Sequence, residues 1–159
     1  MKYIFVVIIL LTLILLPSPV IADDTVTSYK AIVVITADDV SGWEGDLRAT
    51  EEITKRQMVL TAGIISSNTT AWDNIKTMVD TGYVEIASHS RTHPSIPYGD
   101  YDSEIGGSAE DIKTNLGISP LAWLNPYGTT DETVLIKLKE YDYIVSRGIT
   151  ENYIIYGER

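Results

Sequence analysis

The stretch Ala31-Ile32-Val33-Val34-Ile35-Thr36-Ala37-Asp38-Asp39 decides the fold class of this chain. Its run of aliphatic residues is typical of a strand that is covered on both faces, as in a parallel sheet inside helices. Such a strand delivers its last residues to the carboxyl edge of the sheet, where α/β proteins place their sites. Two adjacent carboxylates at that edge repel each other, so the sequence predicts a positive group beside Asp38 and Asp39.

Apolar segments and helical segments alternate along the rest of the chain. The expected strands cover residues 31–37, 58–65, 83–88, 121–124 and 143–145, and the expected helices cover 46–56, 70–79, 103–116 and a segment that opens at 130–132. This alternation indicates βα units and a parallel sheet. About five βα units are compatible with half of a larger barrel or with an open sheet, and the sequence alone leaves closure open.

The first 22 residues have the pattern of a secretory signal. Lys2 precedes an apolar run from Ile4 to Leu16, and Ala22 stands at the expected cleavage point. The alternative is an uncleaved membrane anchor, because residues 3–21 are just long enough to span a bilayer. We therefore expect a signal or anchor over 1–22, a linker over 23–29 and a folded domain over 30–159. In either case the domain would work outside the cytoplasm, secreted or membrane-anchored.

The composition argues against several partners and one kind of metal site. Without residues 1–22, which contain Lys2 as their only charged residue, the chain carries 11 basic and 22 acidic side chains. Nucleic acids and anionic membranes require a positive surface, so we expect no nucleic-acid partner, and membrane contact only through the N-terminal segment. Because the chain has no cysteine, carboxylates and imidazoles must form any metal site.

The chain's only two histidines lie four residues apart in His89-Ser90-Arg91-Thr92-His93. On one helical turn this spacing would place both imidazoles on the same face. One carboxylate from another strand end would complete three ligands and leave open positions, as in catalytic zinc sites. The second carboxylate could accept a proton from the attacking water. Each pattern alone is more often structural, but their combination at two strand ends favours a functional site.

Three segments resemble the motifs of NodB-type polysaccharide deacetylases. Residues 36–39, Thr-Ala-Asp-Asp, are similar to the first motif, Thr-Phe-Asp-Asp, and residues 89–94 are similar to the second, His-Ser/Thr-x-x-His-Pro. Residues 125–128, Asn-Pro-Tyr-Gly, resemble the end of the third, Arg-x-Pro-Tyr-Gly. The resemblance runs from about residue 30 to about residue 148. It implies a distorted (β/α) barrel, which this chain would form incompletely, with about five βα units.

The resemblance also implies roles for individual residues. Asp39, His89 and His93 would bind Zn²⁺ or another divalent transition metal, and Asp38 would be the general base. The backbone amide of Tyr127 would help to stabilise the tetrahedral oxyanion, which is a strong effect when the donor is preorganised.

The substrate implied by the resemblance is an N-acetylated polysaccharide of the chitin or peptidoglycan kind, from which the protein would remove acetyl groups. Pro126 and Tyr127 would contact this glycan, and Trp43 could stack on a sugar ring. Two alternatives remain open. The chain could be a catalytically impaired member that binds glycans or survives as a remnant, or it could hydrolyse another carbon–nitrogen bond.

The chain departs from the family pattern at several positions. Leu124 stands where the third motif has an arginine that pairs with the base aspartate. Ala37 replaces the aromatic residue before Asp38, and Val40 replaces the glycine after Asp39. No histidine follows His93, although the family has a late histidine that protonates the leaving amine. The metal site is therefore the better supported part of the predicted chemistry.

Overall fold

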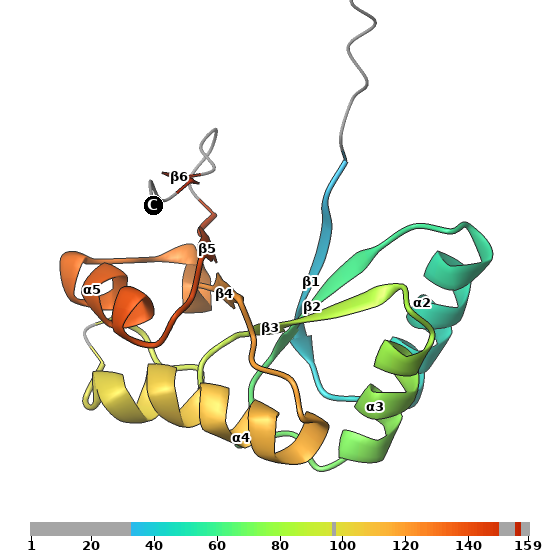
Figure 1. Ribbon diagram of the computed structural model, residues 1–159, viewed down its shortest axis with the longest axis horizontal. Helices are drawn as coiled ribbons and strands as arrows, with labels where there is room; N and C mark the ends of the chain where they lie inside the picture. Colours follow the sequence, from blue (N-terminus) through green and yellow to red (C-terminus); the bar gives the residue numbers. More distant parts are fainter. Residues whose placement is uncertain (1–32, 97, 150–154, 157–159) are drawn as a thin grey trace, which may run out of the picture. The chain divides into compact units, whose positions relative to one another are not determined.

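The computed structural model describes residues 33–96, 98–149 and 155–156. The expected signal or anchor over 1–22, the linker over 23–29 and the start of the first expected strand lie outside the described residues. In the described part, six strands form one sheet in the order β1-β2-β3-β4-β5-β6 (Figure 1). The first five strands are parallel and β6 is antiparallel to β5. The predicted βα units are therefore confirmed.

The strands are short and their helices are amphipathic. The strands are β1 (Ile35–Val40), β2 (Leu60–Ile64), β3 (Val84–Ser88), β4 (Ala122–Leu124), β5 (Val145–Arg147) and β6 (Ile155–Tyr156). The helices are α2 (Glu44–Lys55), α3 (Trp72–Asp80), α4 (Ser108–Leu116) and α5 (Glu132–Glu140), with a π-helix η1 (Asp102–Gly107) and a 3-10 turn η2 (Pro126–Gly128). In the part of the chain that the structure covers, no helix is both long enough and apolar enough to cross a bilayer.

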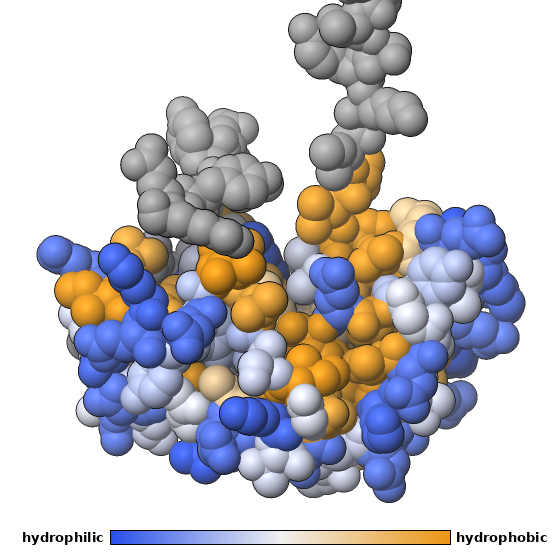
Figure 2. Space-filling view, in the orientation of Figure 1, coloured by the Kyte–Doolittle hydropathy of each residue, from blue (hydrophilic) through white to orange (hydrophobic). Residues whose placement is uncertain are grey.

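Two hydrophobic clusters hold the helices against the sheet. The first joins β1, β2 and β3 to α3 and α4, with Ile64, Ile75 and Ile112 fully buried. The second surrounds the buried indole of Trp123 on β4 and includes Val134 of α5. Apolar side chains gather over strands β1 to β3, whereas α2 carries mostly hydrophilic residues toward solvent (Figure 2).

The sheet curls until its first and last parallel strands approach each other. Arg147 on β5 contacts the carboxylate of Asp38 on β1 across the concave side of the sheet. Because β1 and β5 are separated by three other strands, this contact requires strong curvature. The sheet is thus half of a barrel, with the carboxyl ends of its parallel strands converging at one edge.

Several expected boundaries differ from the observed ones. The helix expected over 103–116 begins as the π-helix η1 and continues as α4, because Gly106 and Gly107 allow close packing there. The helix expected over 70–79 begins two residues later, at Trp72, with Ala71 as its N-cap. Strand β1 runs through both aspartates to Val40, and β6 was not expected from the sequence.

Candidate metal centre

Asp38 and Asp39 lie on a bulge of β1. Ala37 pairs with Ala62 and Val40 with Ile64, so β1 contains one residue more than β2 between these pairs. Asp39 adopts the left-handed conformation with φ of 59°, which aspartate tolerates better than most residues. A bulge of this kind redirects side chains. The expected abrupt end of the strand before these residues is therefore wrong, and the bulge presents both carboxylates at the sheet edge.

Asp39, His89 and His93 form a cluster whose ligand atoms all lie within 4.8 Å of one another. The His89 and His93 Nε2 atoms are 3.1 Å apart. Asp39 Oδ1 lies 3.5 Å from His89 Nε2 and 3.7 Å from His93 Nε2. Two ligands bound tetrahedrally to zinc at about 2.0–2.1 Å would be roughly 3.3 Å apart. The spacing of the cluster therefore fits one small divalent ion.

His89 is oriented for metal binding by its other ring nitrogen. Its Nδ1 lies 2.7 Å from the carbonyl oxygen of Leu124, which can only accept a hydrogen bond. The ring is therefore protonated at Nδ1 and has a free lone pair at Nε2, the atom that faces His93 and Asp39. A carbonyl behind a metal-binding histidine commonly fixes the ring in this way. The His89 side chain is only 2 % exposed, so its orientation is well defined.

The chain between the two histidines is an irregular turn and not the helical turn that their spacing suggested. Ser90 and His93 both have positive φ, 67° and 60°. The two imidazoles meet edge to face, with ring centroids 4.7 Å apart. The spacing of four residues thus brings the rings together through a different backbone path from the one expected.

Arg147 supplies a positive group beside Asp38 that was not predicted from the sequence. Its Nη2 contacts Asp38 Oδ1, while Asp38 Oδ2 lies 3.9 Å from His89 Nε2. Arg147 on β5 is the register partner of Leu124 on β4, the position at which the family motif has its arginine. The guanidinium therefore comes from the neighbouring strand, and Asp38 is paired although residue 124 is a leucine.

Asn125 supports this arrangement from the end of β4. Its side chain is buried, and its Nδ2 donates to the Arg147 carbonyl oxygen at 3.0 Å and to Ser146 Oγ at 2.9 Å. Its Oδ1 accepts from Trp123 Nε1 at 2.9 Å. Sequence reasoning missed Arg147 and Asn125 as site residues. The signal that could have found Arg147 is its place just after a predicted parallel strand, at the same sheet edge as the aspartates.

The other predicted site residues occupy different environments. Tyr127 stacks edge to face on His93, with ring centroids 4.6 Å apart, and its backbone is left-handed with φ of 54°. The side chain of Pro126 is buried, which suits a role in fixing the turn. Trp43 precedes α2 and is 71 % exposed, free to contact a ligand. The roles assigned to Tyr127, Pro126 and Trp43 toward a substrate stay predictions.

Comparison with protein families gives one match over most of the chain. The sequence model of the polysaccharide deacetylase family matches residues 25–146. No curated protein sequence matches the chain.

Solved structures with the same fold are similar to the chain over most of its length. A polysaccharide deacetylase from Bacillus cereus is 26% identical with a TM-score of 0.69, and the match covers 79% of this chain and 42% of that protein. A family 4 carbohydrate esterase from Streptomyces lividans, in complex with acetate, is 23% identical with a TM-score of 0.65. The match covers 74% of this chain and 62% of that protein. A deacetylase from Streptococcus pyogenes, also in complex with acetate, is 20% identical with a TM-score of 0.65. The match covers 73% of this chain and 55% of that protein.

The chain spans roughly half the length of these structures. The match to the family's sequence model, over residues 25–146, includes both aspartates and both histidines. The predicted fold class, an incomplete NodB-like (β/α) barrel of about five βα units, is confirmed.

Proposed function

Because the chain belongs to the polysaccharide deacetylase family, we propose that it is a metal-dependent hydrolase that removes acetyl groups from an N-acetylated glycan. One observation carries this proposal. The cluster of Asp39, His89 and His93 has the spacing of a three-ligand metal site, and a second carboxylate, Asp38, lies beside it and is held by Arg147. A set of three N and O ligands with open positions is typical of catalytic rather than structural zinc.

Asp39, His89 and His93 would hold Zn²⁺ or a similar divalent ion through one oxygen and two Nε2 atoms. A divalent ion bound there would supply Lewis-acid polarisation of the acetamide carbonyl group. The hydrogen bond from His89 Nδ1 to the Leu124 carbonyl keeps the metal-binding lone pair available.

Asp38 would act as the general base. Arg147 occupies its Oδ1, so Oδ2 is the oxygen that remains on the side of the histidine cluster. A carboxylate in this position can accept a proton from the water that attacks the carbonyl carbon. The adjacent guanidinium fixes the orientation of the Asp38 carboxylate.

The oxyanion that develops on the acetamide would be stabilised by the backbone N–H of Tyr127. The left-handed backbone of Tyr127 and the contact of its ring with His93 place this turn beside the histidine cluster. A preorganised donor of this kind contributes about 3–4 kcal/mol to transition-state stabilisation in other hydrolases. Tyr127 and Trp43, both exposed, would offer aromatic surface to the sugar.

Two similar structures, those from Streptomyces lividans and Streptococcus pyogenes, contain acetate. This supports acetyl as the group that the protein removes from its substrate. Polymeric N-acetylated glycans lie outside the cytoplasm, in agreement with the secretory pattern of residues 1–22. We therefore propose that the protein is secreted or membrane-anchored.

The test is acetate release by the purified protein from N-acetylglucosamine oligomers with added zinc. The blank is the Asp39→Ala protein, which lacks one ligand. Release above this blank would support the proposal. A screen of small acetylated amides, run in parallel, would reveal activity on another carbon–nitrogen bond.

A second candidate is a glycan-binding member without turnover. The features that favour it are the departures from the family motifs at Ala37, Val40 and Leu124. A similar structure, 20% identical with a TM-score of 0.63, is a mutant of a pseudoenzyme from carbohydrate esterase family 4 with restored activity. Oligosaccharide binding by the zinc-loaded protein, without acetate release from any substrate, would favour this second candidate.

A further inference from the structure

The turn that joins His89 to His93 has a conformation that needs external support. Ser90 and His93 both adopt left-handed backbone angles, which are uncommon for residues other than glycine. Such residues persist only where their surroundings hold them in place. The turn sets the positions of both imidazoles, so whatever holds it also sets the 3.1 Å distance between the two Nε2 atoms.

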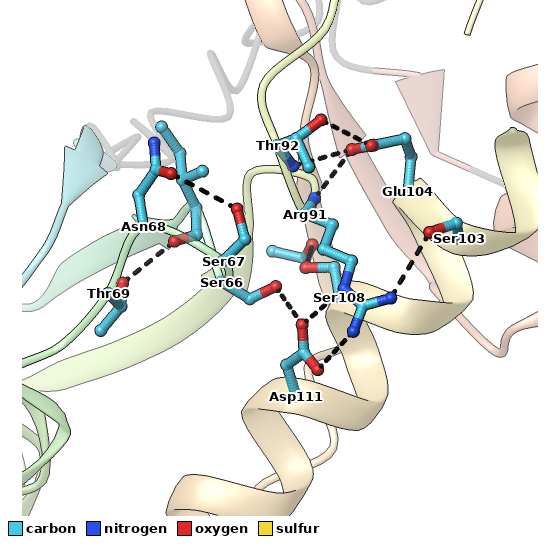
Figure 3. A network of polar contacts seen from close by, with 12 residues as sticks. Ser66, Ser67, Asn68, Thr69, Arg91, Thr92, Ser103, Glu104, Ser108 and Asp111 are labelled. Carbon is cyan, nitrogen blue, oxygen red and sulfur yellow. Dashed lines mark hydrogen bonds and ion pairs between the residues drawn. The ribbon is translucent and has the colours of Figure 1, made fainter. Parts of the chain in front are cut away.

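Glu104, on the π-helix η1, makes the main contacts with this turn. Its Oε2 accepts hydrogen bonds from the backbone N–H groups of Arg91 at 3.1 Å and of Thr92 at 2.9 Å. Its Oε1 accepts from Thr92 Oγ1 at 2.6 Å. Figure 3 shows the carboxylate of Glu104 pointing directly at this part of the turn. Glu104 is only 8% exposed, so these contacts are largely shielded from water.

The backbone N–H groups of residues 91, 92 and 93 all donate hydrogen bonds to side chains. Those of Arg91 and Thr92 point to Glu104, and that of His93 donates to Ser90 Oγ at 2.8 Å. Two successive N–H groups that converge on one oxygen form an anion-binding concavity. A carboxylate fits it because it offers acceptors only.

The same helical segment also holds the turn through Arg91. Its guanidinium makes a two-pronged contact with Asp111 on α4, with Nε–Oδ2 of 3.0 Å and Nη2–Oδ1 of 3.2 Å (Figure 3). A Cβ on Gly107 would lie 3.0 Å from Arg91 Nη1, so glycine allows this close approach. Glu104 on η1 and Asp111 on α4 therefore both contact the turn. π-helical segments such as η1 occur frequently at functional sites.

From these contacts we infer that Glu104 is a positioning residue for the metal centre: its buried carboxylate fixes the turn between the two histidine ligands and thereby sets their separation. The inference rests on the metal site of the proposed function and is independent of which amide the protein hydrolyses. Glu104 does not itself contact the cluster.

The decisive variant is Glu104→Gln, which keeps the size of the side chain. The neutral amide oxygen is a weaker acceptor for the two backbone N–H groups than the carboxylate oxygen, and the NH₂ group cannot accept from Thr92 Oγ1. Thr92→Val removes the hydroxyl contact alone, and Thr92→Ser restores a hydroxyl at the same position. The matched control is Glu110→Gln, which changes an exposed glutamate on α4.

Three measurements on the purified full chain test the inference. Zinc affinity is measured by calorimetry, the ligand geometry is followed in the visible absorption spectrum of the Co²⁺ form, and hydrogen exchange of the Arg91 and Thr92 amides is measured without metal. We expect Glu104→Gln to weaken zinc binding by about 10- to 100-fold, as supporting residues of metal ligands commonly do. The Co²⁺ spectrum should change and the two amides should exchange faster, whereas Glu110→Gln should match the unchanged protein in all three.

Thr92→Val should weaken zinc binding less than Glu104→Gln, and Thr92→Ser should restore it. If Glu104→Gln binds zinc as tightly as the unchanged protein, with the same Co²⁺ spectrum, the inference is overturned while the metal site stands. If Glu104→Gln does not fold, equal zinc affinities of the Thr92→Val and Thr92→Ser proteins would overturn it. If the unchanged protein itself binds no zinc or Co²⁺, the proposed metal site fails and the inference fails with it.

Discussion

The guanidinium of Arg147 on β5 contacts the carboxylate of Asp38 on β1, joining the first and last parallel strands of the half-barrel. Arg147 is the register partner of Leu124, which occupies the position of the motif arginine. A charge that the family motif supplies from one strand is therefore supplied here from the next strand.

Arg147→Ala should lower kcat/KM for deacetylation by about 100-fold or more, because Asp38 loses the group that orients it. Zinc affinity should change little, since Arg147 contacts none of the three ligand atoms. Arg147→Lys should recover only part of the activity, because an ammonium group lacks the planar fork of guanidinium. Arg48→Ala, which removes an exposed arginine on α2, is the control. Full activity in Arg147→Ala would contradict the role of this contact.

Asp38→Asn should keep zinc affinity and lose deacetylase activity, whereas His93→Ala should lose both. The amide of asparagine cannot accept the proton of the attacking water, but it leaves the three ligands unchanged. Removing His93 leaves two ligands, too few for a stable catalytic zinc site. Calorimetry with zinc and an acetate-release assay on the same preparations separate these outcomes. An active Asp38→Asn protein would contradict the role of Asp38 as general base.

Gly63→Ala should destabilise the fold. A Cβ at this position of β2 would lie 2.6 Å from Leu124 Cδ1 and 3.4 Å from His89 Cβ. The displaced leucine is the residue whose carbonyl orients His89, so zinc affinity should fall as well. We expect a loss of about 1–3 kcal/mol in the free energy of unfolding, as for other overpacked cores.

The control for this change is Gly45→Ala on α2, where a Cβ meets no atom within 4 Å. Alanine favours a helix over glycine, so this protein should be stabilised by up to about 1 kcal/mol. Urea unfolding of both variants, followed by circular dichroism, gives the comparison. Equal midpoints for the two variants would show that the site beside Leu124 tolerates a methyl group.

The stability of the protein should fall as the pH rises above about 10, in part because of Tyr143. Burial raises the pKa of Tyr143 to about 12, so the folded state keeps this proton after the unfolded state has lost it. The contribution of Tyr143 to the free energy of unfolding is complete below the pKa of about 10 that tyrosine has in the unfolded state. It is lost progressively as the pH rises to the pKa in the folded state. The shift of about two units corresponds to roughly 2–3 kcal/mol.

Tyr143→Phe removes this titration and isolates its effect from those of other tyrosines and lysines. The ring can still pack edge to face on Trp123, as the tyrosine ring does with centroids 5.6 Å apart. We expect the free energies of unfolding of the two proteins to differ little at pH 8 and to diverge in favour of Tyr143→Phe at pH 11. Parallel pH profiles would show that burial does not perturb this tyrosine.

The sequence was sufficient to predict the parallel βα units and the meeting of both aspartates with both histidines at one sheet edge, because these features depend on local patterns. The aliphatic run before Asp38 and the apolar segment before His89 each identify a strand, and parallel strands bring their carboxyl ends to one edge. The pairing of Asp38 with Arg147 was not predicted, since it depends on how far the sheet curls. Curvature results from the packing of all five strands against their helices and has no signature in a single segment.

The turn between the histidines shows a second limit. A spacing of four residues fits a helical turn and an irregular turn equally well, and tertiary contacts such as those of the buried Glu104 decide between them. The register of Glu104 depends in turn on the π-helix η1, whose i→i+5 hydrogen bonds have no pattern of their own in the sequence. The pair Gly106-Gly107 weakens a regular helix but gives no indication of which residues pack against it.

The order of the site residues along the chain has a consequence for synthesis of the protein. All three ligand atoms come from the first three strands and the turn that follows, whereas the partner of the base comes from β5, 109 residues after Asp38. Chains are made from the N-terminus, and early segments can fold first. A nascent chain would therefore carry all three proposed metal ligands before Arg147 has been synthesised, so under the proposed function binding of the ion would precede pairing of the base.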